Sequence, residues 1–256
     1  MITLKSEAEF AKMDAAGRVL EDTFHVLYDA VKPGVTTGEL DRIADAYIRS
    51  RGGIPSELGY CGYPKSICAS VNEQVVHGIP GPRVLKDGDI VSLDIVVELD
   101  GYQADACRTF LVGNVSDEVK DLVRVTRECF FEALKVARPG YRIGDIGAAV
   151  QQHAESHGYG VVREMIGHGI GREMHEDPEV PNYGHAGHGV RLQAGMAICI
   201  EPMITLGSRK VRFGSDGWEC CTADGKPAAH YENTVRITDG EPVLLTLHGE
   251  EIGYAG

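Results

Sequence analysis

The sequence predicts a mixed fold of helices and strands (α+β), in which two related α/β halves form a single domain. Four segments carry apolar residues at helical spacing, several others are apolar runs typical of buried strands, and the order of these segments repeats about 106 positions later. The halves are expected to span about 1–112 and 113–256. A chain of 256 residues is long enough to bury a full-sized core.

Two helices are expected in the first half. Ser6 and Glu9 form a capping-box pattern, and apolar residues then recur at three- and four-residue steps until Pro33. Thr36 starts the second helix in the same way, and Gly52 ends it.

The second half has the same order of elements. Ser116 caps a helix that extends to Pro139, and a further helix runs from about Ile143 to His157. Strands are expected over residues 89–99, 102–112, 196–206, 231–238 and 242–247.

The repeat itself is carried by turn residues and by one acidic position. Pro33, Gly34, Gly38, Ser50 and Gly52 recur as Pro139, Gly140, Gly144, Ser156 and Gly158, and Leu85, Gly88 and Asp94 recur as Leu192, Gly195 and Glu201. Glycine is abundant, so single matches arise by chance. The shared order of helix, Pro-Gly turn, helix and acidic strand favours a duplicated unit.

The composition excludes several classes of function. The 38 acidic side chains against 25 basic ones give a net charge of −13, which argues against binding to nucleic acids or to anionic membranes. The longest apolar stretches fall far short of the roughly 20 residues of a membrane span. The seven cysteines contain no C-x-x-C pair, and the N-terminal residues show no apolar signal core. We therefore expect a cytoplasmic protein.

Two aspartates are expected close together in a predicted hairpin. Asp100-Gly101 predicts a two-residue turn, which places Asp94 opposite Cys107 and makes Asp105 its diagonal neighbour, about 7 Å away. Two like charges in an apolar strand pair require a proton or a cation, unless one of them faces solvent.

Two glutamates add to this pair. Glu201 and Glu232 each lie in an apolar strand segment, and the repeat places Glu201 at the position of Asp94. Four inward carboxylates from two similar halves fit a two-metal site better than a proton-sharing pair.

Three histidines are candidates for the remaining chemistry. His168 lies between two glycines, and His175 follows seven positions later, so both reach one site only if this segment bends. His77 precedes Gly-Ile-Pro, which resembles the sequence after His168. Each histidine taken alone is also compatible with a structural, hydrogen-bonded role. The chain contains no H-E-x-x-H motif.

The ordered series of these residues resembles that of the methionine aminopeptidases, over nearly the whole chain. The series comprises His77-Gly-Ile-Pro, Asp94, Asp105, His168-Gly-Ile-Gly, His175, Glu201-Pro-Met and Glu232. The resemblance implies the pita-bread fold, with two pseudo-symmetric α/β halves around a central antiparallel sheet. Because only 31 positions separate the last two acidic residues, the chain resembles the type I, bacterial form, without the helical insertion of type II enzymes or a zinc-finger extension.

The resemblance also implies roles for these residues. Two divalent ions (Mn, Fe, Co or Zn) are expected on five ligands: Asp94, Asp105, His168, Glu201 and Glu232. Asp105 and Glu232 would bridge the ions, which activate the attacking water, and Glu201 would move its proton. His175 is expected to stabilise the oxyanion and His77 to contact the substrate amide nitrogen.

A pocket for the methionine side chain follows from the same resemblance. Its expected residues are Tyr60, Tyr63, Cys68, Met174 and Trp218, together with His77 and His175. Aromatic walls and soft sulfur suit an unbranched thioether, although the tyrosines could also anchor a loop and the tryptophan could belong to the core. Four positions differ from the familiar bacterial enzymes of this family. Met174 stands where those enzymes have Phe, and Cys61 stands where they often have His. Glu57 and Val96 replace smaller or polar residues expected near the pocket.

The implied function is removal of the N-terminal methionine from nascent proteins and peptides whose second residue is small. The expected enzyme is monomeric and acts near the ribosome, although no motif for ribosome contact is visible. One alternative is a proline-specific aminopeptidase of the same fold, but those usually carry a large N-terminal domain. The other is a non-catalytic binding module, but such relatives lose their metal ligands.

Overall fold

The computed structural model describes residues 1–249 and 251, and it contains the four predicted helices. They are α1 (Glu7–Ala30), α2 (Thr37–Ser50), α3 (Asp117–Leu134) and α4 (Ile143–Ser156), and a short 3-10 turn spans Tyr60–Gly62. The side chain of Ser6 accepts a hydrogen bond from the Glu9 amide, and Thr36 caps α2 in the same way. Both predicted capping boxes are confirmed. No helix within the described residues is long and apolar enough to cross a membrane.

The main sheet has nine strands among the residues that the structure describes. Seven of them follow one another in the order β1 (Ile54–Pro55), β4 (Ile90–Leu99), β5 (Tyr102–Leu111), β14 (Glu232–Arg236), β9 (Ala197–Ile200), β7 (Gly167–Gly169) and β8 (Glu176–Val180). In addition, β2 (Cys68–Val71) pairs with β4, and β15 (Val243–Leu244) pairs with β14. Two small sheets accompany it. One consists of β13 (Ala228–His230), β10 (Met203–Thr205) and β6 (Gly160–Val161). The other consists of β11 (Val211–Phe213), β12 (Cys220–Thr222) and β3 (Gln74–Val76). All pairings between these strands are antiparallel.

The predicted hairpin has the expected register. Strands β4 and β5 pair so that Asp94 lies opposite Cys107 and Asp105 lies opposite Val96. The turn residues Asp100 and Gly101 have φ angles of 52° and 75°, as a tight hairpin turn of this length requires.

One predicted strand is wrong as a single element. Residues 196–206 form two strands in two different sheets, β9 and β10, separated by Glu201 and Pro202. Proline has no backbone N–H to continue a ladder, so the sheet pairing stops there. The last two strands are also shorter than predicted.

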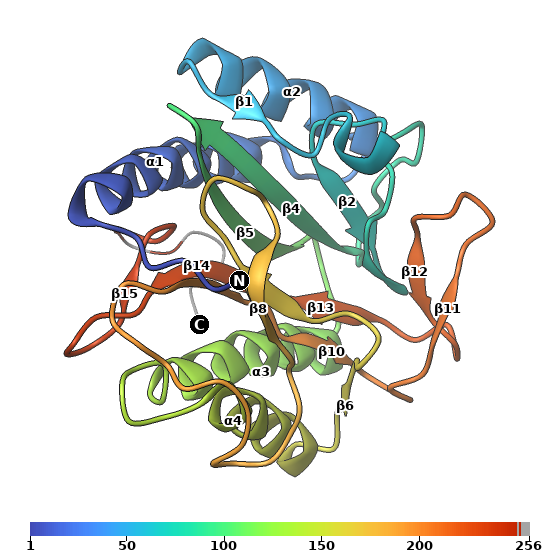
Figure 1. The fold of residues 1–256 in the computed structure, drawn as a ribbon. Coiled ribbons are helices and arrows are strands. Elements are labelled where there is room, and N and C mark those ends of the chain that lie inside the picture. Colours follow the sequence, from blue (N-terminus) through green and yellow to red (C-terminus); the bar gives the residue numbers. More distant parts are fainter. Residues whose placement is uncertain (250, 252–256) are drawn as a thin grey trace.

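Each helix pair packs on its own part of the sheet. Helices α1 and α2 bury their apolar faces with β2, β4 and β5 in one core, and α3 and α4 form a second core with β9 and β14. Figure 1 shows the two helix pairs on opposite sides of the strands. The sheet between the two pairs is therefore a protected place for polar side chains.

Turn conformations repeat between the halves. The φ angles are 97° and 98° at Gly34 and Gly140, and 81° and 82° at Gly52 and Gly158. Isolated bridges join Thr36 to Val84 in one half and Arg142 to Arg191 in the other. These matches support the proposed division into halves of about 1–112 and 113–256.

Candidate metal centre and substrate pocket

The predicted metal ligands lie on neighbouring strands of the main sheet. Asp94 is on β4 and Asp105 on β5, Glu232 begins β14, Glu201 directly follows β9, and His168 is the middle residue of β7. Because these strands are adjacent in the order β4-β5-β14-β9-β7, four of the side chains lie on the sheet itself and Glu201 lies at the end of its strand β9, beside them.

The ligand atoms converge at short distances. His168 Nε2 lies 3.5 Å from Asp105 Oδ2 and 3.6 Å from Glu201 Oε1. Side-chain atoms of Asp105, His168 and Glu232 lie within 4.8 Å of one another, as do those of Asp94 and Glu232. The alternative in which one aspartate of the hairpin faces solvent is therefore wrong.

Burial makes these carboxylates hard to ionise in the absence of a cation. Desolvation raises the pKa of Asp105 from 3.8 to about 7, and it raises the pKa values of Asp94, Glu201 and Glu232 well above their ordinary range. The negative charges of neighbouring carboxylates add to the effect at the last three. These carboxylates can be ionised together at neutral pH only with a compensating positive charge beside them.

Unpartnered oxygens show where such a charge fits. Asp94 Oδ1, Asp105 Oδ1 and Glu232 Oε1 are buried and have no hydrogen-bond partner among the described residues. Burial also lowers the pKa of His168 to about 4, so its imidazole is neutral at pH 7. Nδ1 of His168 lies 2.8 Å from the Gly169 carbonyl and donates to it, which leaves the Nε2 lone pair directed at the carboxylates. One neutral imidazole and several carboxylates suit divalent metal ions.

His175 reaches the same site through the bend that the sequence required. The chain turns back between β7 and β8, so the rings of His168 and His175 are 4.2 Å apart between centroids. Nδ1 of His175 lies 2.8 Å from the hydroxyl of Tyr60. Burial lowers the pKa of His175 to about 4, and it also lowers that of His77.

All the predicted substrate-binding residues line one cavity of about 180 Å³ together with the metal-ligand candidates. Tyr63 packs edge-on against Trp218 at 5.1 Å between ring centroids, and His77 lies 6.4 Å from the same indole. The Tyr63 hydroxyl also donates to the carbonyls of Ile67 and Gly78, so this tyrosine both anchors a loop and lines the cavity. His77 has a φ of 59°, an uncommon backbone conformation that directs its ring here.

Sequence reasoning missed His230. Its Nε2 lies 3.6 Å from Glu232 Oε2 and 3.9 Å from Glu201 Oε2, and neither ring nitrogen has a hydrogen bond within the described part of the chain. Burial lowers its pKa to about 3. Its position two residues before a buried glutamate was the available signal. Met203 and Met165 also line the cavity, together with Glu57 and Val96.

Comparison with known proteins agrees with this geometry. Residues 11–246 match metallopeptidase family M24. The methionine aminopeptidase of Clostridium perfringens is 52% identical over 247 residues, which cover 96% of this chain and 99% of that protein. The solved methionine aminopeptidase of Rickettsia prowazekii has a TM-score of 0.95 and 43% identity, covering 96% of this chain and 100% of that chain.

A more distant structure shares the fold alone. The prolidase of Pyrococcus furiosus has a TM-score of 0.77 at 20% identity, and the match covers 66% of the prolidase chain. The pita-bread fold predicted from the sequence is confirmed by these neighbours. This chain belongs to metallopeptidase family M24, among the methionine aminopeptidases.

Proposed function

We propose that this protein removes the N-terminal methionine from peptides and nascent proteins whose second residue is small. The observation that carries the proposal is the meeting of five metal-ligand candidates with an aromatic and sulfur-lined cavity. The relatives named methionine aminopeptidase support the same activity.

The ligands of the proposed two-metal centre are Asp94, Asp105, His168, Glu201 and Glu232. Asp105 and Glu232, on the adjacent strands β5 and β14, would hold the ions together with the other three ligands. Bound divalent ions supply Lewis acidity to polarise the scissile carbonyl and to activate water. Mn, Fe, Co and Zn all fit this donor set.

The protein groups position the substrate and move protons. Glu201 has a carboxylate at the cavity wall and accepts the proton of the attacking water. The Tyr60 hydroxyl fixes the orientation of His175, which faces the cavity and stabilises negative charge on the carbonyl oxygen. His77, beside Trp218, contacts the amide nitrogen of the substrate.

The cavity accounts for the choice of side chain. Tyr60, Tyr63 and Trp218 provide aromatic surface, while Cys68, Met174 and Met203 provide sulfur. An unbranched, polarisable thioether packs well against both kinds of wall. A second cavity shares His168 and His175 with the first and is the proposed exit for the rest of the peptide.

We further propose that the enzyme is a cytoplasmic monomer that meets its substrates near the ribosome. Its substrate is the first residue of a new chain, which supports this location. Gel filtration with light scattering tests the monomer, and co-sedimentation with ribosomes tests the encounter.

A peptide assay tests the activity. Metal-free protein is reconstituted with each divalent ion and given Met-Ala-Ser, a peptide with proline in second position, and a peptide with internal methionine only. Free methionine is expected from the first peptide and not from the internal-methionine control. Release specific to peptides with proline in second position would instead favour the proline-specific alternative, and no release with any ion would overturn the enzymatic proposal.

Two isosteric substitutions test the ligand assignment. Asp105→Asn and Glu232→Gln are each expected to abolish turnover and weaken metal binding. Glu118→Gln, on the exposed face of α3, is the matched control and is expected to behave as wild type. Full activity of either ligand variant would show that the assignment is wrong.

A further inference from the structure

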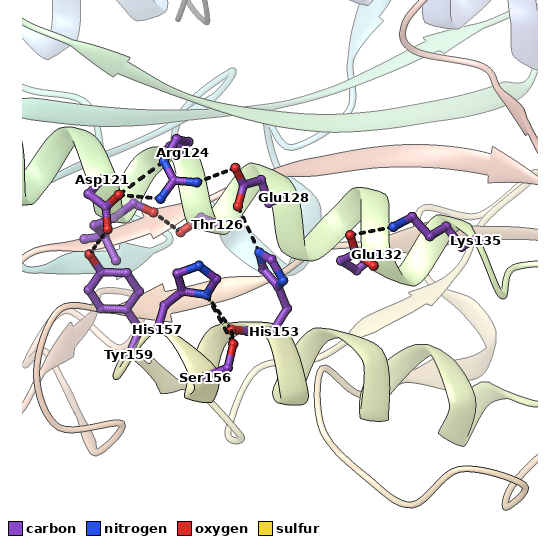
Figure 2. Close-up of polar contacts among 11 residues, drawn as sticks. Asp121, Arg124, Thr126, Glu128, Glu132, Lys135, His153, Ser156, His157 and Tyr159 are labelled. Carbon is purple, nitrogen blue, oxygen red and sulfur yellow. Dashed lines mark hydrogen bonds and ion pairs between the residues drawn. The ribbon is translucent and has the colours of Figure 1, made fainter.

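A second group of metal-ligating side chains lies on the helix pair of the second half, away from the cavity. Glu128 belongs to α3, His153 belongs to the last turn of α4, and His157 is the residue that caps the C-terminal end of α4. Figure 2 shows both imidazoles between α4 and α3, with Glu128 reaching down from α3 to His153. None of the three lines the substrate cavity. The proposed peptidase activity gives them no role.

Their spacing is that of a helical metal site. Residues four apart lie one above the other on a helix face, so His153 and His157 present their rings side by side, 4.6 Å apart between centroids. His153 Nε2 lies 2.9 Å from Glu128 Oε2. One ligand atom from each of the three residues lies within 4.8 Å of the other two.

Hydrogen bonds fix the direction of one imidazole. Nδ1 of His157 is 2.9 Å from the His153 carbonyl oxygen, which only accepts hydrogen bonds, so Nδ1 carries the proton. The Nε2 lone pair of His157 is then free for a metal ion. A backbone carbonyl on the other ring nitrogen is the usual second partner of a metal-bound histidine.

The carboxylate is ionised and partly accessible. Burial alone would raise the pKa of Glu128, but hydrogen bonds from His153 and Arg124 lower it below its ordinary value. Arg124 occupies the other oxygen, Oε1, and is itself shared with Asp121, which offsets its positive charge. Oε2 therefore remains available to an ion that replaces the hydrogen bond from His153.

We propose that Glu128, His153 and His157 bind a transition-metal ion, with Zn²⁺ as the best match, and thereby link α3 to α4. Two imidazoles and one carboxylate are a common ligand set for zinc, with water in the fourth position. Metal–ligand distances of about 2.0–2.2 Å require the three side chains to close together by small rotations. His153 has to carry its proton on Nδ1 so that Nε2 is free to coordinate.

Equilibrium dialysis with Zn²⁺ tests the site, because it counts ions independently of activity. Wild-type protein is expected to bind one ion more per chain than His157→Gln, or to bind that ion at least about tenfold more tightly. The exposed His25→Gln on α1 is the matched control and is expected to retain the wild-type number. Equal zinc binding by wild type and His157→Gln would overturn the proposal.

A thermal measurement separates this site from the catalytic one. Added Zn²⁺ is expected to raise the melting temperature of Asp105→Asn protein, and the double variant with His157→Gln is expected to lose that rise. His157→Gln alone is expected to keep full peptidase activity, since it lies outside the cavity. An unchanged zinc-induced rise in the double variant would contradict the link between α3 and α4.

Discussion

Replacing Gly169 by alanine tests how the glycines beside His168 shape the metal centre. Gly169 lies in β7, between β8 and β9, and pairs with Glu176 on one side and Ile198 on the other. A Cβ atom at this position would lie 2.1 Å from the Asp177 carbonyl oxygen and 2.9 Å from that of Glu176. Both contacts are with backbone atoms of β8, so no flexible side chain can move away.

The expected cost follows from these distances. An ordinary Cβ contact begins at about 3.4 Å, so β7 and β8 would have to separate by about 1 Å. Overpacking of this kind costs about 1–3 kcal/mol of unfolding free energy. His168 is the adjacent residue, and its Nε2 lies only 3.5 Å from Asp105. A misplacement of about 1 Å at a reacting centre lowers the rate by about 100-fold.

Urea unfolding and the Met-Ala-Ser assay, made on the same preparation, measure the two effects. Gly240→Ala is the control, because a Cβ there would meet only Thr238 Oγ1, at 3.9 Å, and the backbone needs no positive φ. The control is expected to match wild type in both measurements. Full activity and unchanged stability of Gly169→Ala would refute the claim that close strand approach at this glycine positions His168.

Three further changes have defined outcomes. His175→Ala is expected to lower kcat by about 100-fold, because a hydrogen-bond donor to the oxyanion is lost, while the metal content is retained. Loss of metal from this variant after dialysis would show that His175 is itself a metal ligand. Glu57→Met removes a buried carboxyl oxygen that has no hydrogen-bond partner in the described structure. The variant should therefore have an unfolding free energy about 1–3 kcal/mol higher than wild type in urea titrations, and a lower value would contradict this reasoning. Glu21→Gln weakens the bonds to His248 and should cost about 1 kcal/mol at pH 7. These bonds hold the pKa of Glu21 below 4.5 despite its burial, so the difference from wild type should shrink as the pH falls from 4.5 through this lowered pKa, and a constant difference would count against it.

Local sequence signals predicted most of the elements that position the site. The capping boxes at Ser6 and Thr36 and the Asp100-Gly101 turn depend on neighbouring residues only, so their consequences were readable, including the register that brings Asp94 and Asp105 together. Short strands such as β1 and β6, of two residues each, were not predicted. They have no periodic pattern of their own and exist because longer strands lie beside them.

The four acidic candidates stood out in the sequence because charge inside an apolar strand is costly, whereas His168 was singled out as a ligand by the family resemblance. His230 has only a weak signal, its position two residues before Glu232. It is adjacent to Tyr231 and not to a glycine or a second histidine, and its approach to Glu201 and Glu232 depends on how β13 pairs with β10 in a separate small sheet. Long-range placement of this kind requires the assembled fold.

The two halves are related, but the cavity depends on where they differ. In the first half the strand that carries Asp94 continues for ten residues, and it pairs along its whole length with β5. In the second half Pro202 ends the equivalent pairing directly after Glu201, and the chain crosses into the sheet of β10 and β13. This crossing places Met203 on the cavity wall and opposite His230. An uninterrupted strand would have kept Glu201 in the ladder and left residues 202–206 in the main sheet. The proposed duplication would account for the matched positions of Asp94 and Glu201, and the proline break accounts for the part of the cavity wall that Met203 forms beside them.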